Sequence, residues 1–437
     1  MLLIYIPEIS SRIEYIFNFI FKYEWSIEYS TTSDLKAFEN YKSEKINYSA
    51  SKHGNEFFIK AFTLLSENSI EKKNPNVAEK YETKILFPNN KLCDLGFDIF
   101  SAIFYMVSRY EEYLPFTPDQ HGRFKASDSL AIKHNFLQIP VVNIWINIFK
   151  KILQKKYPLL QIKSTTFNAI LTYDIDVAYK FKGRNLLRTI GSSTKDLLKF
   201  DLKNIFQRGK TLFNGQKDPW DVYDYLWETI LKNNLDSVFF FLLADNSTND
   251  RNLSHENQVM KRLINKIKTF SEIGIHPSYK SSLFPEKILI EKERLEKITN
   301  KKIIKSRQHF LKFILPETYN SLLNAGITEE YSMVFPSMPG FRAGTCRSFY
   351  FYDLKNEKAT RLKIFPVTMM EGSFINNKTG LNESSQQILD LIKEVKKVNG
   401  TFISIWHNDT ISETAEYRDW KNIHDQMIRA ILEIHSV

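Results

Sequence analysis

The chain has 437 residues, with 60 Lys and Arg against 50 Asp and Glu, a formal net charge of +10. Hydrophobic residues make up 43% and charged residues 25%, a globular balance that excludes disorder, collagen-like sequence and a disulfide-stapled miniprotein. This length predicts two domains, or one large domain with a smaller partner. Cys93 and Cys346 are the only cysteines, so we expect no zinc ribbon and no disulfide framework, but two packed thiols in a reducing compartment.

The N-terminal segment does not resemble a secretory signal, because it lacks a basic region and acidic residues such as Glu8 and Glu14 interrupt any apolar run. No stretch approaches the roughly 20 apolar residues of a spanning helix. We therefore expect a cytoplasmic protein. The positive charge leaves three partner classes open: nucleic acid, an anionic membrane surface or an acidic substrate.

The first 165 residues mix short strand-like runs with helical patterns. Residues 2–5 and 57–61 favour strands, whereas 98–113 and 141–155 carry apolar residues at helical spacing. The polar segment 67–83 indicates a loop. We expect a smaller α+β domain of unknown role over residues 1–165.

From residue 166 onward, strand-like and helical patterns alternate. This alternation predicts a parallel sheet over 166–437, either a barrel or a doubly wound sheet. The expected strands are 167–173, 237–243, 272–275, 302–305, 362–367 and 401–406, and the expected helices are 218–233, 256–270, 286–300, 317–325, 384–398 and 414–434.

Polar residues with catalytic potential directly follow several of these strands. The carboxyl ends of parallel strands form one rim, where α/β proteins build their active sites. Five places far apart in the sequence would therefore converge on one mouth. The residues are Asp174, Asp176, His276, Arg307, His309, Glu371 and His407.

Asp174 and Asp176 point the same way if their strand is extended, and two adjacent carboxylates repel unless a cation or proton lies between them. Metal binding by one and a general-base role for the other would resolve that conflict, and His276 on the same rim favours a metal. Arg307 after a buried strand suits the clamping of a carboxylate. His407 at a strand end suits proton donation to a leaving group.

Four further residues are candidates for substrate binding. Arg342 lies in the run Gly340–Thr345, which predicts either a glycine-hinged turn or an arginine aimed at the cleft. Tyr331 and Trp406 offer a sugar a stacking face or belong to the core. Glu371 is a loop glutamate on the expected rim.

In this order, these residues resemble the polysaccharide deacetylase superfamily, the NodB homology domain of carbohydrate esterase family four. Thr172–Asp176 resembles its first motif, which implies Asp174 as the general base and Asp176 as a metal ligand. His276 matches half of the second motif. Arg307–Phe310 resembles the third motif, and His407 ends a strand as the family's general acid does.

The resemblance implies a distorted (β/α) barrel and a metal-dependent hydrolase that removes N-acetyl groups from a sugar of a bacterial polysaccharide or its precursor. Zinc is the expected metal. The segments 108–113 and 122–124 resemble the N-terminal region that accompanies such domains in some bacterial proteins.

Lys280 stands where the family has its second metal-binding histidine, and a protonated lysine is a poor ligand. His309 could serve as the third protein ligand, the metal could keep two protein ligands with more waters, or metal binding could be lost. We favour His309. The alternatives to the deacetylase are a catalytically degraded carbohydrate-binding member of the same fold and a hydrolase of another C–N bond.

Most of the positive charge lies in residues 180–217, with ten Lys and Arg against two acids. This distribution weakens a nucleic-acid interpretation, for which no fold signature is present. The same segment carries many apolar residues, which favours either a helical hairpin packed on the barrel or a flap that docks on an anionic cytoplasmic leaflet and meets a lipid-linked sugar there.

Overall fold

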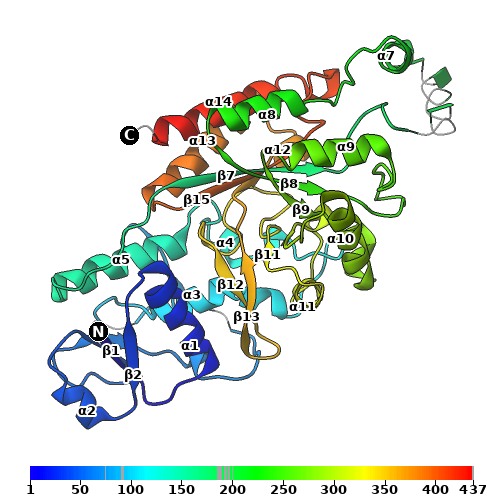
Figure 1. Cartoon of the computed structure of the whole chain (residues 1–437). Helices are drawn as coiled ribbons and strands as arrows, with labels where there is room; N and C mark the ends of the chain where they lie inside the picture. The colour runs from blue at the N-terminus through cyan, green and yellow to red at the C-terminus, as the bar shows by residue number, and fades with distance from the viewer. Residues whose placement is uncertain are drawn as a thin grey trace.

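The computed structural model describes residues 1–73, 75–89, 93–184, 189–190, 194, 197–198 and 200–435. It is a mixed α/β structure in which a small N-terminal sheet lies beside a larger, mostly parallel sheet (Figure 1). Within the described residues, no helix is both long and apolar enough to cross a membrane. Cys93 and Cys346 are buried free thiols, as expected.

The N-terminal region contains a parallel sheet with the strand order β2-β1-β3-β4. The strands expected at 2–5 and 57–61 are present as β1 and β4. The loop expected over 67–83 is wrong in part, because β5 pairs with β6 there as an antiparallel hairpin. The strands are β1 (Leu2–Tyr5), β2 (Tyr29–Thr32), β3 (Lys45–Ser49), β4 (Phe57–Lys60), β5 (Val77–Lys80) and β6 (Thr83–Leu86). The α-helices are α1 (Ser11–Phe17), α2 (Leu35–Asn40), α3 (Ile99–Val107), α4 (Leu130–Lys133) and α5 (Val141–Lys156).

The larger sheet has, among the described residues, the order β12-β13-β11-β10-β9-β8-β7-β15-β14, and every neighbouring pair except β12 and β13 is parallel. Each of the six expected strands is present, β9 with the expected bounds and the other five with one or both ends shifted. The strands are β7 (Asn168–Ile175), β8 (Asp236–Phe241), β9 (Glu272–Ile275), β10 (Lys305–Ser306), β11 (Glu329–Glu330), β12 (Phe349–Asp353), β13 (Lys358–Ile364), β14 (Met369–Met370) and β15 (Thr401–His407).

Helices connect these strands, and α8, α13 and α14 lie together along β7, β8 and β15 on the side away from the N-terminal sheet (Figure 1). The six expected helices are present, whereas α12 was not expected. The helices are α7 (Leu202–Phe213), α8 (Tyr223–Lys232), α9 (Gln258–Ile267), α10 (Glu286–Thr299), α11 (Glu317–Asn324), α12 (Glu371–Asn376), α13 (Leu381–Lys397) and α14 (Trp420–His435).

The stretch between β13 and β14 connects the two ends of the larger sheet. Phe365 N donates to the Glu330 carbonyl of β11, and Thr368 N donates to the Ile403 carbonyl of β15, both at 2.8 Å. Apolar side chains from opposite strands, including Phe240, form a separate buried cluster under this connection. The strand ends that carry the candidate site residues are therefore gathered around one enclosed core.

A buried ionic network joins the N-terminal region to the larger sheet. Glu112 accepts hydrogen bonds from Arg109 Nε at 2.8 Å and from Arg342 Nε and Nη2 at 2.9 and 2.6 Å. All three residues are buried. Burial raises the pKa of Glu112, but the two guanidinium groups outweigh burial and hold that pKa below its usual value. One cluster of buried apolar side chains also runs through both regions, and the division at residue 165 stays a prediction.

This network corrects the role expected for Arg342. Its guanidinium is only 2% exposed and lies over the rings of Phe313 and Phe335 at 4.4 and 4.7 Å. Because both of its ends are used by Glu112 and by the Val334 carbonyl, Arg342 does not reach a substrate. The glycine-flanked turn thus connects two regions of the chain.

Replacement of Glu112 by glutamine is expected to destabilise the protein by about 3–5 kcal/mol, because the buried guanidinium of Arg342 loses its counter-charge and that of Arg109 keeps only Glu111. Denaturant unfolding at neutral pH measures this difference. Since the pKa of Glu112 is lowered in the folded state, its contribution is present above the usual value of 4.5 and is lost as the pH falls. The control is Glu317→Gln, which removes an exposed 3.4 Å pair with Lys355 and should cost about 1 kcal/mol or less. Equal losses in both variants would contradict the role of the network.

Candidate active site

The candidate residues converge at the carboxyl ends of the central parallel strands. Asp174 lies at the end of β7 and Asp176 directly after it, and His276 follows β9. His309 comes three residues after β10, and His407 is the last residue of β15. They line one cavity of about 500 Å³, within the range of about 300–1,000 Å³ typical of small-molecule sites.

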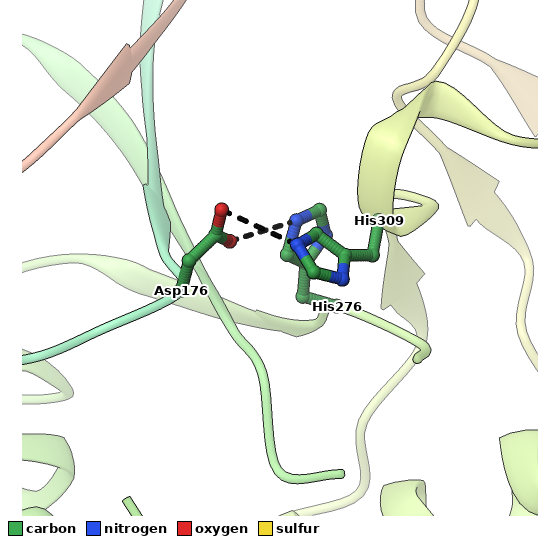
Figure 2. Close-up of side chains that lie close together, drawn as sticks. All are labelled: Asp176, His276 and His309. Atoms are coloured by element: carbon green, nitrogen blue, oxygen red, sulfur yellow. Dashed lines mark ion pairs between the residues drawn. The ribbon is translucent and has the colours of Figure 1, made fainter. Parts of the chain in front are cut away.

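Asp176, His276 and His309 form a group with ligand atoms that lie within 4.8 Å of one another. Figure 2 shows the carboxylate of Asp176 facing both imidazoles. Asp176 Oδ1 is 3.2 Å from His276 Nε2, and its Oδ2 is 3.4 Å from His309 Nε2 (Figure 2). One carboxylate and two imidazoles are a ligand set that divalent zinc accepts. Lys280 is exposed on the surface and belongs to no such group among the residues with described positions.

The two imidazoles are held through their other nitrogens. His276 Nδ1 lies 2.5 Å from the Arg307 carbonyl, which only a protonated Nδ1 can approach as a donor. His309 Nδ1 lies 2.9 Å from Oδ1 of the buried Asp250. Both Nε2 atoms are therefore left facing Asp176. This arrangement, in which a carbonyl or carboxylate orients a ligand histidine, is usual around bound metals.

Sequence reasoning missed Asp250. It lies in the polar turn after β8, where it also accepts from Tyr279 N at 2.9 Å and from Ser247 Oγ at 2.8 Å. Aspartate is common in turns, so Asp250 does not stand out among the other turn-forming residues of this segment. The sequence feature that could have identified Asp250 is its position after the next strand along the chain from Asp174 and Asp176, on the same rim.

The site fits a cation. The buried Oδ1 of Asp176 receives no hydrogen bond from the described residues, and it faces an Nε2 that has no proton when Nδ1 holds it. Two lone pairs in contact require a proton or a metal ion between them. Burial raises the pKa of Asp176, but the neighbouring imidazoles of His309 and His276 outweigh burial and hold that pKa well below its usual value. Asp176 is thus ionised at neutral pH, as a ligand must be.

Asp174 is held by Arg307. Arg307 Nη1 donates to Asp174 Oδ1 at 2.8 Å, while its Nε donates to the Tyr331 carbonyl at 2.9 Å and its guanidinium lies 4.5 Å from the Phe240 ring centroid. The second oxygen, Oδ2, lies 3.8 Å from His276 Nε2. One oxygen is therefore engaged, and the other faces the cluster of Asp176, His276 and His309.

His407 lies on the other side of Asp176, with 3.8 Å between its Nε2 and Asp176 Oδ2. Its Nδ1 and its backbone N both lie 2.7 Å from Oε1 of Glu371. Burial lowers the pKa of His407, but Glu371 and the aspartates Asp176 and Asp174 raise it well above its usual value. His407 is therefore protonated at neutral pH in the metal-free chain.

All four residues expected to contact a substrate directly are placed otherwise: Arg342 is buried in the network with Glu112, and the other three are buried as follows. Glu371 is fully buried and holds the imidazole of His407, so the expectation that this glutamate contacts a substrate is wrong. Tyr331 is 2% exposed and stacks on Phe365 with 4.5 Å between ring centroids. Trp406 is fully buried beside Trp420. Because neither aromatic ring is accessible, both belong to the core, which was the second of the two interpretations of these residues, and neither offers a sugar a stacking face.

The cavity also includes residues that sequence reasoning did not select. From the N-terminal region come Gln120, His121 and Arg123. From the opposite wall come Ser337, Asn376 and Asn377. No motif marks these positions, and only the packing of the two regions brings them to the rim.

Comparison with known proteins gives limited likenesses. Residues 2–158 match the model of a family of unknown function, DUF7033. No curated protein matches the chain. Among solved structures, the chain is similar to a putative polysaccharide deacetylase from Mycobacterium smegmatis, with a TM-score of 0.40 and 11% identity over 62% of this chain and 85% of that one.

Two further likenesses concern Bacillus proteins. The polysaccharide deacetylase Bc1974 from Bacillus cereus has a TM-score of 0.31 and 11% identity over 62% of this chain and 87% of its own. A CE4 family pseudoenzyme from Bacillus anthracis has a TM-score of 0.31 and 12% identity over 61% of each chain. These TM-scores are too low to establish a common fold, so the function has to be inferred from the side chains of the site.

Metal affinity is expected to rise with pH. Burial lowers the pKa of His309, but the carboxylates of Asp176 and Asp250 outweigh burial and raise it to about 9. Nε2 of His309 must therefore lose a proton before it can bind a metal. Between neutral pH and about 9, the affinity for zinc should increase about tenfold per pH unit and then level off. Titration calorimetry in buffers of different ionisation enthalpy measures both the affinity and the proton released.

Two variants test the assignment of this proton. His309→Ala should weaken zinc binding by more than about tenfold and remove most of the pH dependence. Lys280→Ala should bind zinc as the wild type does, because this lysine is exposed outside the triad. Unchanged metal content in His309→Ala, or loss of metal in Lys280→Ala, would rule out the triad.

Proposed function

We propose that the protein is a metal-dependent hydrolase that removes N-acetyl groups from a sugar of a bacterial polysaccharide or its precursor. The observation that carries this proposal is one cavity in which the triad of Asp176, His276 and His309 lies between an arginine-held Asp174 and a glutamate-held His407. Hydrolysis of an amide needs a base, an acid and stabilisation of a developing oxyanion. The residues of this cavity also belong to the sequence motifs that resemble those of the polysaccharide deacetylases.

Asp176, His276 and His309 would hold the metal, and zinc suits this set of one oxygen and two nitrogen ligands. A bound zinc ion polarises a carbonyl oxygen and lowers the pKa of a coordinated water. The chain contributes the orientation: Asp250 and the Arg307 carbonyl fix the two imidazoles with Nε2 toward Asp176.

Asp174 is assigned as the general base. Its Oδ1 is occupied by Arg307 Nη1 at 2.8 Å, so Oδ2 is the oxygen that would accept the proton of the attacking water. The guanidinium also fixes the orientation of the carboxylate, so that Oδ2 faces the triad. Arg307 therefore holds the base and does not itself exchange a proton.

His407 is assigned as the general acid. Because Glu371 and nearby aspartates raise its pKa well above its usual value despite burial, it holds a proton at neutral pH. Its Nδ1 is bound to Glu371 at 2.7 Å, which leaves Nε2–H to protonate the amide nitrogen as the C–N bond breaks. Water supplies the new C–O bond, and the products are acetate and a free amino sugar.

The alternative of a catalytically degraded carbohydrate-binding member was motivated by Lys280. With His309 beside Asp176 and His276, the triad has three ligand side chains without Lys280, and no observation favours the degraded alternative. Hydrolysis of another C–N bond would use the same groups and is separated from deacetylation by the product released.

We infer that the finer fold is the distorted (β/α) barrel of this superfamily. What supports it is the stretch 365–370, which donates from Phe365 N to the Glu330 carbonyl of β11 and pairs through β14 with β15. A single segment thereby bridges the two ends of an otherwise open order of strands. The antiparallel pairing of β12 with β13 is the remaining difference from a barrel of parallel strands.

Replacement of Asp174 by asparagine is expected to lower the turnover number for acetate release by about 10²–10⁴-fold, because the attacking water loses its base. Acetate release from N-acetylglucosamine oligosaccharides measures it on the zinc-loaded enzyme. Zinc content should stay at the wild-type level, since Asp174 lies outside the triad. Full activity in Asp174→Asn would refute the assignment, whereas loss of zinc in this variant would make Asp174 a ligand.

We also propose that the basic segment 180–217 contacts an anionic leaflet on the cytoplasmic side. Residues 185–188, 191–193, 195–196 and 199 of that segment lie outside the described residues. In the described part, α7 projects from one end of the molecule (Figure 1). Phe206 and Phe213 on this helix are 66% and 85% exposed, beside the exposed Lys203 and Lys210. Exposed apolar and basic side chains on one helix suit an anionic bilayer surface.

The full-length protein is therefore expected to bind vesicles that contain phosphatidylglycerol more tightly than vesicles of phosphatidylcholine alone, and added salt should weaken the binding. A Phe206→Ala, Phe213→Ala double variant should lose affinity by about tenfold or more, because two aromatic side chains no longer insert. Leu159→Ala is the control, as this leucine is 83% exposed elsewhere. Equal binding to both vesicle types, independent of salt, would exclude the contact.

A further inference from the structure

A loop of the N-terminal region forms one wall of the active-site cavity. Residues 117–124 place Gln120, His121 and Arg123 in the same cavity as Asp174 and the metal triad. The mechanism uses none of these three side chains. The loop belongs to the part of the chain that matches a family of unknown function. The N-terminal region, and not the larger sheet, therefore supplies this wall of the cavity.

Asp119 makes this loop rigid. Its carboxylate accepts from the backbone N of His121 at 2.8 Å, from the backbone N of Arg123 at 2.9 Å and from Arg123 Nε at 2.8 Å. Asp119 and Arg123 also pair through their backbones at 3.0 Å. Gly122 between them has a φ of +82°, which a residue with a side chain rarely adopts. The loop therefore presents Gln120 and His121 from a preformed turn.

The loop is fastened next to a proposed metal ligand. Arg123 Nη1 donates to the Phe310 carbonyl at 2.5 Å, and Phe310 directly follows His309. The His121 ring packs against the Phe310 ring with 5.1 Å between centroids. His121 Nδ1 also lies 3.2 Å from the Tyr279 hydroxyl. These contacts set the distance of the loop from the metal triad, so its polar tip lies at a defined place beside the reacting centre.

Apart from Arg123, whose charge is paired with Asp119, the side chains that the loop presents to the cavity are uncharged. Gln120 is exposed, and its Nε2 lies 3.3 Å from His121 Nε2. Burial, together with Arg123 and Lys312, lowers the pKa of His121, so the ring is neutral at pH 7. The same cavity is also lined by the neutral side chains of Ser337, Asn376 and Asn377. Amide, imidazole and hydroxyl groups suit the hydroxyls of an uncharged sugar.

We propose that Gln120 and His121 form a subsite for the sugar unit next to the one that loses its acetyl group. They bind the hydroxyls of a neutral oligosaccharide and so make the enzyme prefer a chain to a single sugar. This inference rests on the proposed deacetylase function. It assigns to the N-terminal region the choice of substrate length, while the barrel performs the hydrolysis.

The experiment compares the tetramer of N-acetylglucosamine with the monomer on the zinc-loaded full-length protein. The wild type should prefer the tetramer, and the ratio of kcat/KM for tetramer over monomer should fall about tenfold in the Gln120→Ala, His121→Ala double variant. The Kd for the tetramer should rise by a similar factor. Zinc content, measured in parallel, should match the wild type, because neither residue belongs to the triad.

The matched control is Gln386→Ala with His134→Ala, two exposed positions outside the cavity, which should leave the ratio unchanged. Equal losses on monomer and tetramer, or a wild type without preference for the tetramer, would overturn the subsite. If the wild type holds zinc but releases no acetate, the deacetylase proposal fails on its own. The subsite is then decided by tetramer binding: a weaker Kd in the double variant supports it, and an unchanged Kd overturns it.

Discussion

The site depends on the compensation of two negative charges, those of the carboxylates Asp174 and Asp176 at the end of one strand. Asp174 and Asp176 leave β7 in the same direction, and without partners their charges would repel in a setting that disfavours ions. The rest of the rim separates their environments. Arg307 neutralises Asp174 from β10, whereas His276 and His309 face Asp176. One carboxylate is thereby suited to hold a proton transiently and the other to bind a cation.

The compensation works because each imidazole is fixed at its far nitrogen. The Arg307 carbonyl, Asp250 and Glu371 each engage an Nδ1 atom, so all three Nε2 atoms are directed toward Asp176. These partners come from three different segments, which follow β10, β8 and β14. A buried aspartate that no motif contains is therefore as necessary to the geometry as the ligands themselves.

The N-terminal region is part of this geometry. Its buried Glu112 binds Arg342 from the turn before β12, and its Arg123 binds the carbonyl that follows His309. These contacts fix its position relative to the rim, and they bring a rigid polar loop to the mouth of the cavity. A role in choosing the substrate follows more directly from this placement than a role as a separate module.

Much of the larger sheet and the rim residues could be predicted from the sequence, because period, strand length and the position of a residue after a strand are local properties. The aspartate pair, His276 and His407 were identified in this way, and His309 was favoured by resemblance. Strands β11 and β14 have two residues each and carry no period. The burial of Arg342, Tyr331 and Trp406, the support of His407 by Glu371 and the arrival of Gln120 and His121 at the cavity were decided only by the tertiary structure, since each depends on contacts with other elements of the fold. The sequence by itself determined which chemical groups leave the strands, and packing between distant segments decided which of them face the cavity.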